Sequence, residues 1–146
     1  MTLEKLIPVL QLAIGPVIFI SGVGLLILSM TNRLGRTIDR ARKLVELRRT
    51  AAGDQMIRIE LQLSILWRRA RMQRAAITLA GIAVLLDALM MILLFLGALV
   101  DLHVALVLAL AFVACMLALI GSILYFLRDI NLSLQALAHE CEIDQP

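Results

Sequence analysis

Three long apolar stretches constrain the fold of this chain more than any other feature. They cover residues 6–30, 75–100 and 102–127, and each exceeds the roughly 20 apolar residues that a helix needs to cross a bilayer. Inside a bilayer only helices and closed barrels satisfy their own backbone groups. The chain is 62% hydrophobic, whereas soluble domains average about 45–50% apolar residues. We therefore expect an all-α integral membrane protein with three transmembrane helices.

Basic residues are concentrated between the first and second apolar stretches. Residues 33–74 hold 12 of the chain's 14 Lys and Arg residues and four acidic ones, a net charge of +8. Basic segments beside a membrane helix stay on the cytoplasmic side. We therefore expect this segment in the cytoplasm, the N-terminus outside and the C-terminus inside, as in a multi-pass membrane protein.

These features divide one domain, residues 1–146, into five parts. We expect a transmembrane helix at 6–31, a basic cytoplasmic helical hairpin at 32–74, transmembrane helices at 75–100 and 102–127, and a cytoplasmic helical tail at 128–146. The first stretch is longer than the core of a signal peptide and lacks a small-residue cleavage site behind it, so we expect it to be retained. The few residues that join the second and third stretches predict a tight helical hairpin.

The basic segment has the spacing of two amphipathic helices. Apolar residues recur at Leu34, Ile38, Ala41 and Val45, and then at Met56, Ile59, Leu63, Leu66 and Ala70. Both runs keep the three- and four-residue spacing of one helix face, and the second suits a coiled-coil seam. Gly53 and Asp54 between them are typical of a helix stop followed by an N-cap. No strong helix breaker separates either helix from its neighbouring apolar stretch, so we expect near-continuous helices.

Asp87 is the one charged residue of stretch 75–100 and lies near its centre. A carboxylate at the middle of a bilayer costs roughly 2.5–3.5 kcal/mol on insertion scales, so such a residue normally faces protein or water. The other stretches supply no Lys or Arg, while Ser21 and Cys115 lie at similar depth. Three roles are open for the carboxyl group: a proton or cation site in a hydrated path, a member of a ring of acids around a pore, or a neutral strut between helices.

Small and polar residues form a stripe along one face of the first apolar stretch. The stripe comprises Gln11, Gly15, Ile18, Gly22, Leu25, Ser29 and Asn32. It predicts either a surface that lines a pore or close helix packing through small residues. The candidate ion-pathway residues are therefore Asp87, Gln11, Ser21, Ser29 and Asn32. In the third stretch, Ala114, Ala118 and Ser122 form a second small-residue packing pattern.

The basic residues nearest the apolar stretches predict contact with anionic lipid headgroups or with a cytoplasmic partner. The candidates are Arg33, Arg36, Arg40, Lys43, Arg68, Arg69, Arg71 and Arg74. Near an anionic membrane surface each such residue contributes about 1 kcal/mol of attraction. Nucleic-acid binding is disfavoured, because a duplex could hardly approach so close to the bilayer. Trp67 is also the segment's one aromatic residue, whereas single-strand binders interleave aromatic and basic side chains.

The sequence carries no pattern of catalytic or metal-binding residues. It has no Gly-rich phosphate loop and no Ser/His/Asp grouping, and it has two His residues in all. We therefore expect no enzyme activity, no cofactor and no metal, and the sequence specifies no small-molecule ligand. Cys115 and Cys141 fall in a membrane stretch and in the tail, so we expect no disulfide.

The junction after the first apolar stretch carries a family resemblance. It reads Thr31-Asn32-Arg33-Leu34-Gly35-Arg36. With Ile65-Leu66-Trp67-Arg68-Arg69 and the tail's Leu132-Ser133-Leu134, it resembles a small bacterial family of three-span membrane proteins known only as a domain of unknown function. The resemblance covers nearly the whole chain and implies a bacterial inner-membrane protein. It implies no activity and no site residues.

Functions of two different classes fit these observations. The first is a homo-oligomeric ion channel or proton pathway, because one protomer's three helices cannot enclose a hydrated path, whereas a ring of protomers repeats Asp87 around an axis. The second is a non-catalytic scaffold or lipid-binding protein in which Asp87 joins helices. A proton-driven stator subunit is third, by analogy of topology. The ion, the gating stimulus, the number of subunits, the pore-facing helix and the charge of Asp87 stay open.

Overall fold

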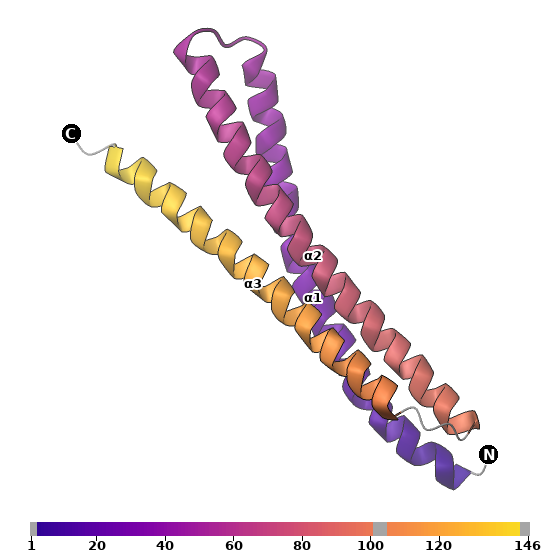
Figure 1. The fold of residues 1–146 in the computed structure, drawn as a ribbon. Helices are drawn as coiled ribbons and strands as arrows, with labels where there is room; N and C mark the ends of the chain where they lie inside the picture. Colours follow the sequence, from indigo (N-terminus) through magenta and orange to yellow (C-terminus); the bar gives the residue numbers. More distant parts are fainter. Residues whose placement is uncertain (1–2, 101–104, 144–146) are drawn as a thin grey trace. The chain divides into compact units, whose positions relative to one another are not determined.

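The computed structural model describes residues 3–100 and 105–143, with side chains for residues 11, 13–97 and 105–132. These residues form three α-helices, α1 (Leu3–Arg48), α2 (Asp54–Val100) and α3 (Ala105–Ile143) (Figure 1). Each helix is long and apolar enough to cross a membrane. The prediction of an all-helical chain with three such helices is therefore confirmed. The predicted connection between the second and third helices and the surroundings of Cys141 lie outside the described residues.

A five-residue turn joins α1 to α2. The N–H groups of Thr50 and Ala51 donate to the carbonyl of Leu47 at 3.2 and 3.1 Å, which closes the end of α1. Gly53 follows with φ of 62°, in the left-handed region that favours glycine. Asp54 is the first residue of α2 rather than the cap before it, and its charge there suits the positive end of the helix dipole.

Contacts group the chain into two compact units. One contains residues 1–28 and 78–121, and the other contains residues 29–77 and 122–146. We call the first the apolar unit and the second the basic unit, because residues 33–74 carry most of the chain's positive charge. Each unit contains a segment of all three helices.

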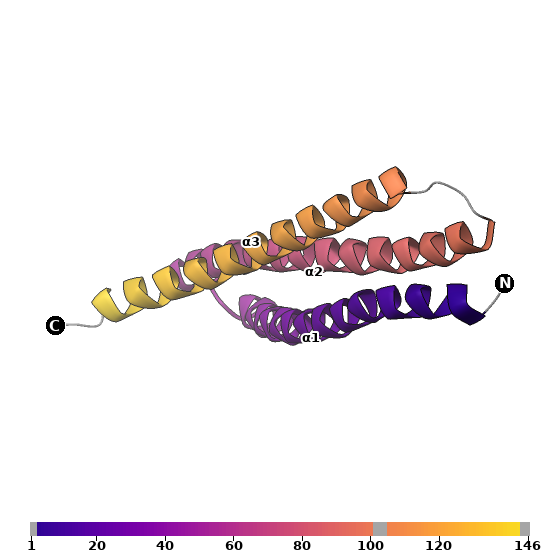
Figure 2. The same ribbon diagram turned by 90° about the horizontal axis from the view of Figure 1, so that it is seen from below.

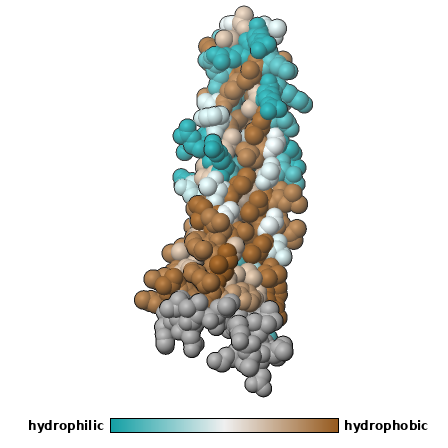
Figure 3. Space-filling view, turned by 90° about the vertical axis from the view of Figure 1, so that its right-hand side faces the viewer, coloured by the Kyte–Doolittle hydropathy of each residue, from teal (hydrophilic) through white to brown (hydrophobic). Residues whose placement is uncertain are grey.

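In the apolar unit, α2 and α3 approach closely through small residues. Ala80 and Ala83 are fully buried, and the thiol of Cys115 donates to the carbonyl of Ala83 at 3.2 Å. A Cβ atom added to Gly121 would lie 3.3 Å from Leu79 Cδ1, so a larger residue would force Leu79 to move. Small residues let membrane helices pack this closely. The outer side chains are apolar, as lipid contact requires (Figure 3).

In the basic unit, buried positions recur every seven residues on each helix. They are Met30 and Thr37 on α1, Ile59, Leu66 and Gln73 on α2, and Ser122 and Asp129 on α3. Ala76 of α2 is buried as well, three residues after Gln73. The hydroxyl of Ser122 donates to the carbonyl of Ala76 at 2.7 Å. Arg48 and Glu60 form an ion pair at 2.8 Å between the two arms of the hairpin. Both of these side chains are about half exposed, so the pair adds little stability.

The packing face of α3 differs from the predicted one by one residue. Cys115 and Ser122 are buried, whereas Ala114 is exposed. The predicted pattern of Ala114, Ala118 and Ser122 follows a four-residue spacing, but the buried face follows the seven-residue spacing of Cys115, Ser122 and Asp129. The prediction was therefore wrong for Ala114 and right for Ser122.

Candidate functional site

Asp129 joins all three helices of the basic unit at one buried point. Its side chain has no solvent exposure. Its carboxylate accepts hydrogen bonds from Gln73 Nε2 at 2.7 Å and from Arg69 Nε at 3.3 Å, both on α2. Arg33 of α1 approaches the same carboxylate at 3.6 Å. The two arginine side chains keep partial exposure, 27% for Arg33 and 18% for Arg69, so one buried acid is held by two cations that reach the surface.

Local helix geometry places the partners of Asp129. Arg69 and Gln73 lie four residues apart and therefore project from the same face of α2. On α1 the hydroxyl of Thr37 donates to the carbonyl of Arg33 one turn earlier, at 3.1 Å. The guanidinium of Arg33 also lies 5.3 Å from the ring centroid of Phe126, which is within the range of a cation–π interaction.

A cavity of about 280 Å³ lies beside this cluster. We call it the arginine cavity, and its lining consists of Arg33, Arg36, Thr37, Arg40, Leu66, Arg69 and Gln73. Arg36 and Arg40 are exposed, and neither forms an ion pair with an acid among the described residues. Four guanidinium groups therefore line the cavity, and the buried carboxylate beside them neutralises one charge.

The chemistry of this cavity suits an anion. A guanidinium presents paired N–H donors that match the oxygens of a phosphate or carboxylate. The carboxylate of Asp129 keeps Arg33 and Arg69 in place, while Arg36 and Arg40 remain directed to solvent. Among the described residues, no group of His, Cys, Asp and Glu could hold a metal ion.

The eight basic residues predicted to contact lipid lie in two hollows and on the exposed surface. Four line the arginine cavity, while Arg71 and Arg74 line a separate hollow of about 230 Å³ with Leu34, Ile38, Trp67 and Ala70. Lys43 and Arg68 are exposed and lie outside both hollows. The two hollows thus differ in lining: the arginine cavity is mainly cationic, and the other is mixed apolar and basic.

Asp87 is buried within the apolar unit, with 3% of its surface exposed. It lies one helical turn after Ala83, whose carbonyl accepts the Cys115 thiol. Its Oδ2 atom has no hydrogen-bond partner among the described residues. The carboxyl group is therefore shielded from lipid by the chain itself. One of its two oxygens nevertheless lacks a hydrogen-bond partner among the described residues.

The other predicted ion-pathway residues are exposed, unlike Asp87. Gln11, Ser21, Ser29 and Asn32 are all exposed on the protomer, and the Ser21 hydroxyl donates to the carbonyl of Val17 in its own helix at 3.0 Å. The buried face of α1 carries Ala13, Val23 and Met30 instead. Asp87 is thus buried, whereas the polar residues of the stripe are exposed.

Sequence reasoning missed Asp129 and Gln73. Asp129 lies two residues after the third apolar stretch, where an acid is unremarkable at the start of a polar tail. One signal was available: Cys115, Ser122 and Asp129 are spaced by seven residues, which keeps them on one face of a packed helix.

Comparison with known proteins assigns the chain to a family but not to a function. Residues 13–139 match a family described as protein of unknown function (DUF2721). No curated protein and no solved structure is detectably similar to the chain.

Proposed function

This chain belongs to the DUF2721 family of proteins of unknown function, and we propose that it is a non-catalytic membrane protein that binds anionic phosphate headgroups. The proposal places the arginine cavity at the cytoplasmic surface of a bacterial inner membrane. The observation that carries it is the cavity itself, which is open to solvent and lined by four arginines.

The position of these residues in the chain suits the headgroup region. Arg33 follows the first apolar stretch by three residues, and Arg69 precedes the second by six. At 1.5 Å per residue these offsets are roughly 5–9 Å, about the thickness of a headgroup layer. The excess of basic residues favours the cytoplasmic side, where the leaflet is rich in anionic lipid.

Native mass spectrometry of the protein purified from mixed phosphatidylglycerol and phosphatidylcholine tests this proposal. The wild-type protein should retain phosphatidylglycerol preferentially. The double variant Arg36→Gln/Arg40→Gln leaves the partners of Asp129 unchanged and should lower the ratio of bound anionic to zwitterionic lipid roughly thirtyfold, since each arginine contributes about 1 kcal/mol. The loss should be smaller at high salt, which screens the attraction in both proteins.

A matched control removes two charges elsewhere in the hairpin. Arg49→Gln/Arg58→Gln changes exposed residues near the α1–α2 turn, outside the arginine cavity, and should leave lipid selectivity unchanged. Equal loss in both double variants would show that net charge alone attracts the lipid and would refute a defined site. Release of the lipid by excess inorganic phosphate would instead identify free phosphate as the ligand.

A second candidate is an ion or proton pathway in a homo-oligomer. The unpartnered Oδ2 of Asp87 supports it, because a purely structural acid would be expected to have its oxygens satisfied. The exposed stripe of α1, with Gln11 and Ser29, would face a second copy in such an assembly. Proton or cation flux into liposomes that is lost in Asp87→Asn would support this function, and a stator-like role would require the same flux. Absence of flux from reconstituted wild-type protein would refute both.

A further inference from the structure

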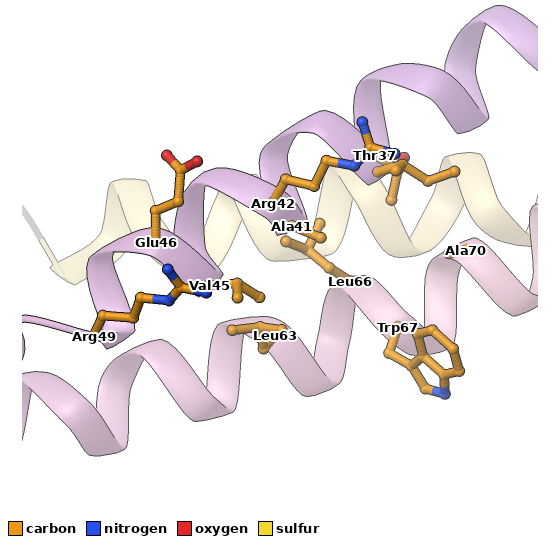
Figure 4. Close-up of a pocket in the computed structure, with 11 residues that line it drawn as sticks. Thr37, Ala41, Arg42, Val45, Glu46, Arg49, Leu63, Leu66, Trp67 and Ala70 are labelled. Atoms are coloured by element: carbon orange, nitrogen blue, oxygen red, sulfur yellow. The ribbon is translucent and has the colours of Figure 1, made fainter.

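An apolar groove runs between α1 and α2 in the basic unit, on the other side of their contact from the arginine cavity. The groove has a volume of about 480 Å³ (Figure 4). We call it the hairpin groove; its apolar wall is formed by Ile38, Val45, Leu63, Leu66, Trp67 and Ala70. Val45 and Leu63 face one another across it in Figure 4. Leu66 and Thr37 border both hollows and so separate them.

The hairpin groove exposes several large apolar side chains along one line. Trp67 is 69% exposed, Val45 is 43% exposed, and Ile38 is exposed as well. A groove lined in this way fits the apolar face of an amphipathic helix. Ile38 and Val45 follow Met30 by 8 and 15 residues, roughly 12–22 Å along a helix, which is too far for lipid tails to cover them. A protein segment therefore suits this groove better than lipid does.

We infer that the hairpin groove binds the C-terminal part of α3 from a second copy of this chain. Helix α3 continues to Ile143, well past the cluster at Asp129. Its sequence repeats apolar residues at Ile130, Leu134, Leu137 and Cys141, the spacing of an amphipathic helix that fits a groove. The segment after Arg128 contains acids and no Lys or Arg, so its charge complements that of the hairpin.

The groove of the same protomer is not available to this segment. Helix α3 is held by Asp129 against Arg33 and Arg69, on the side of the hairpin that carries the arginine cavity. Figure 1 shows the C-terminal part of α3 diverging from the α1–α2 hairpin. Reaching the hairpin groove would require Asp129 to leave both arginines, which would strand buried charge.

In a neighbouring copy the hairpin groove lies at the same distance from the membrane as the C-terminal part of α3. Residues 134–143 follow the third apolar stretch by 7–16 residues, and the groove residues 38–45 follow the first stretch by 8–15. Copies inserted with the same topology therefore place the two segments at the same distance from the bilayer. Arg42 borders the groove at 12 residues beyond Met30, and Glu140 lies 13 residues beyond Leu127, so these opposite charges coincide in depth.

Cross-linking between two differently tagged copies tests the inference in membranes. One copy carries Val45→Cys together with Cys141→Ser, and the other keeps its native Cys141. A short bis-maleimide should link the two tags. The matched control replaces Val45→Cys with Lys43→Cys, which lies two residues away, is exposed and does not line the groove; it should give only background product.

A charge swap gives an independent readout. Arg42→Glu in the first copy should lower the linked product roughly threefold, the value of one exposed ion pair. Glu140→Lys in the second copy should restore it.

Three outcomes would overturn the inference. The first is that Lys43→Cys gives as much cross-linked product as Val45→Cys. The second is a link within one chain that carries both Val45→Cys and Cys141. The third is that Val45→Cys is protected from maleimide but forms no link between copies. The last would assign the groove to a different protein. None of these outcomes depends on lipid binding in the arginine cavity.

Discussion

At the scale of single residues, Asp129 is the acid whose environment most constrains the protein. It has no solvent exposure and is held by Arg33, Arg69 and Gln73. Removing one member of a buried ion pair leaves its partners without compensation and costs roughly 3–5 kcal/mol. We expect Asp129→Asn to lower the free energy of unfolding by roughly 3 kcal/mol, near the lower end because both arginines keep some contact with water. SDS-induced unfolding in mixed micelles measures this loss, and Asp39→Asn, an exposed acid on α1, should change it by less than about 0.5 kcal/mol.

Asp87 is also buried, but its environment predicts that replacing it will not lower the free energy of unfolding. Its Oδ2 atom has no partner among the described residues, and a buried unsatisfied oxygen costs about 1–3 kcal/mol. Replacing the carboxyl group with an apolar one of similar size removes that cost. Asp87→Leu should therefore leave the free energy of unfolding unchanged or raise it by about 1 kcal/mol, whereas Asp129→Leu should lower it in the same assay. A large loss of stability in Asp87→Leu would show that Asp87 is a structural strut.

At the scale of helices, the turn between α1 and α2 depends on one glycine. Gly53 has a φ of 62°, and no atom would crowd an added Cβ. Gly53→Ala therefore affects stability through the backbone conformation alone. We expect this substitution to lower the free energy of unfolding by about 1 kcal/mol. Gly35 provides the matched control, because it also has free space for a Cβ but lies inside α1. Gly35→Ala should stabilise the protein by about 0.5–1 kcal/mol. Thermal unfolding followed by circular dichroism measures both, and a stabilising Gly53→Ala would contradict the assigned turn.

The helices themselves could be predicted because each follows from local information. The apolar stretches are long enough to demand helices, and the segment between them keeps helical spacing on both sides of the turn at Gly53. The choice of buried face on α3 could not be predicted in the same way. Ala114 and Cys115 are both small enough to pack, and which one is buried depends on where Ala83 of α2 lies. That position is a tertiary property.

At the scale of the whole molecule, the sequence predicted the charge of the candidate site but not its structure. The excess of basic residues after Met30 is visible in the chain. The pairing of Arg69 with Asp129 spans 60 residues, and it became apparent only when three helices were brought together. Asp87 attracted attention because an acid in an apolar stretch is conspicuous, whereas Asp129 resembles an ordinary polar residue after a membrane helix. Burial, rather than local sequence, distinguishes the two acids.

A ligand that binds the arginine cavity should stabilise the folded protein as a whole. A site that exists only in the folded state adds RT ln(1 + [L]/Kd) to the free energy of unfolding, about 2.7 kcal/mol when the ligand is at 100 times its Kd. Titrating phosphatidylglycerol into a zwitterionic detergent should therefore raise the melting temperature of the wild-type protein progressively. The rise should be largely lost in Arg36→Gln/Arg40→Gln and retained in Arg49→Gln/Arg58→Gln. Phosphatidylcholine should have little effect on any of the three proteins. If phosphatidylglycerol stabilised all three equally, the arginines would attract lipid only as a diffuse surface charge, and the cavity would have no role in binding.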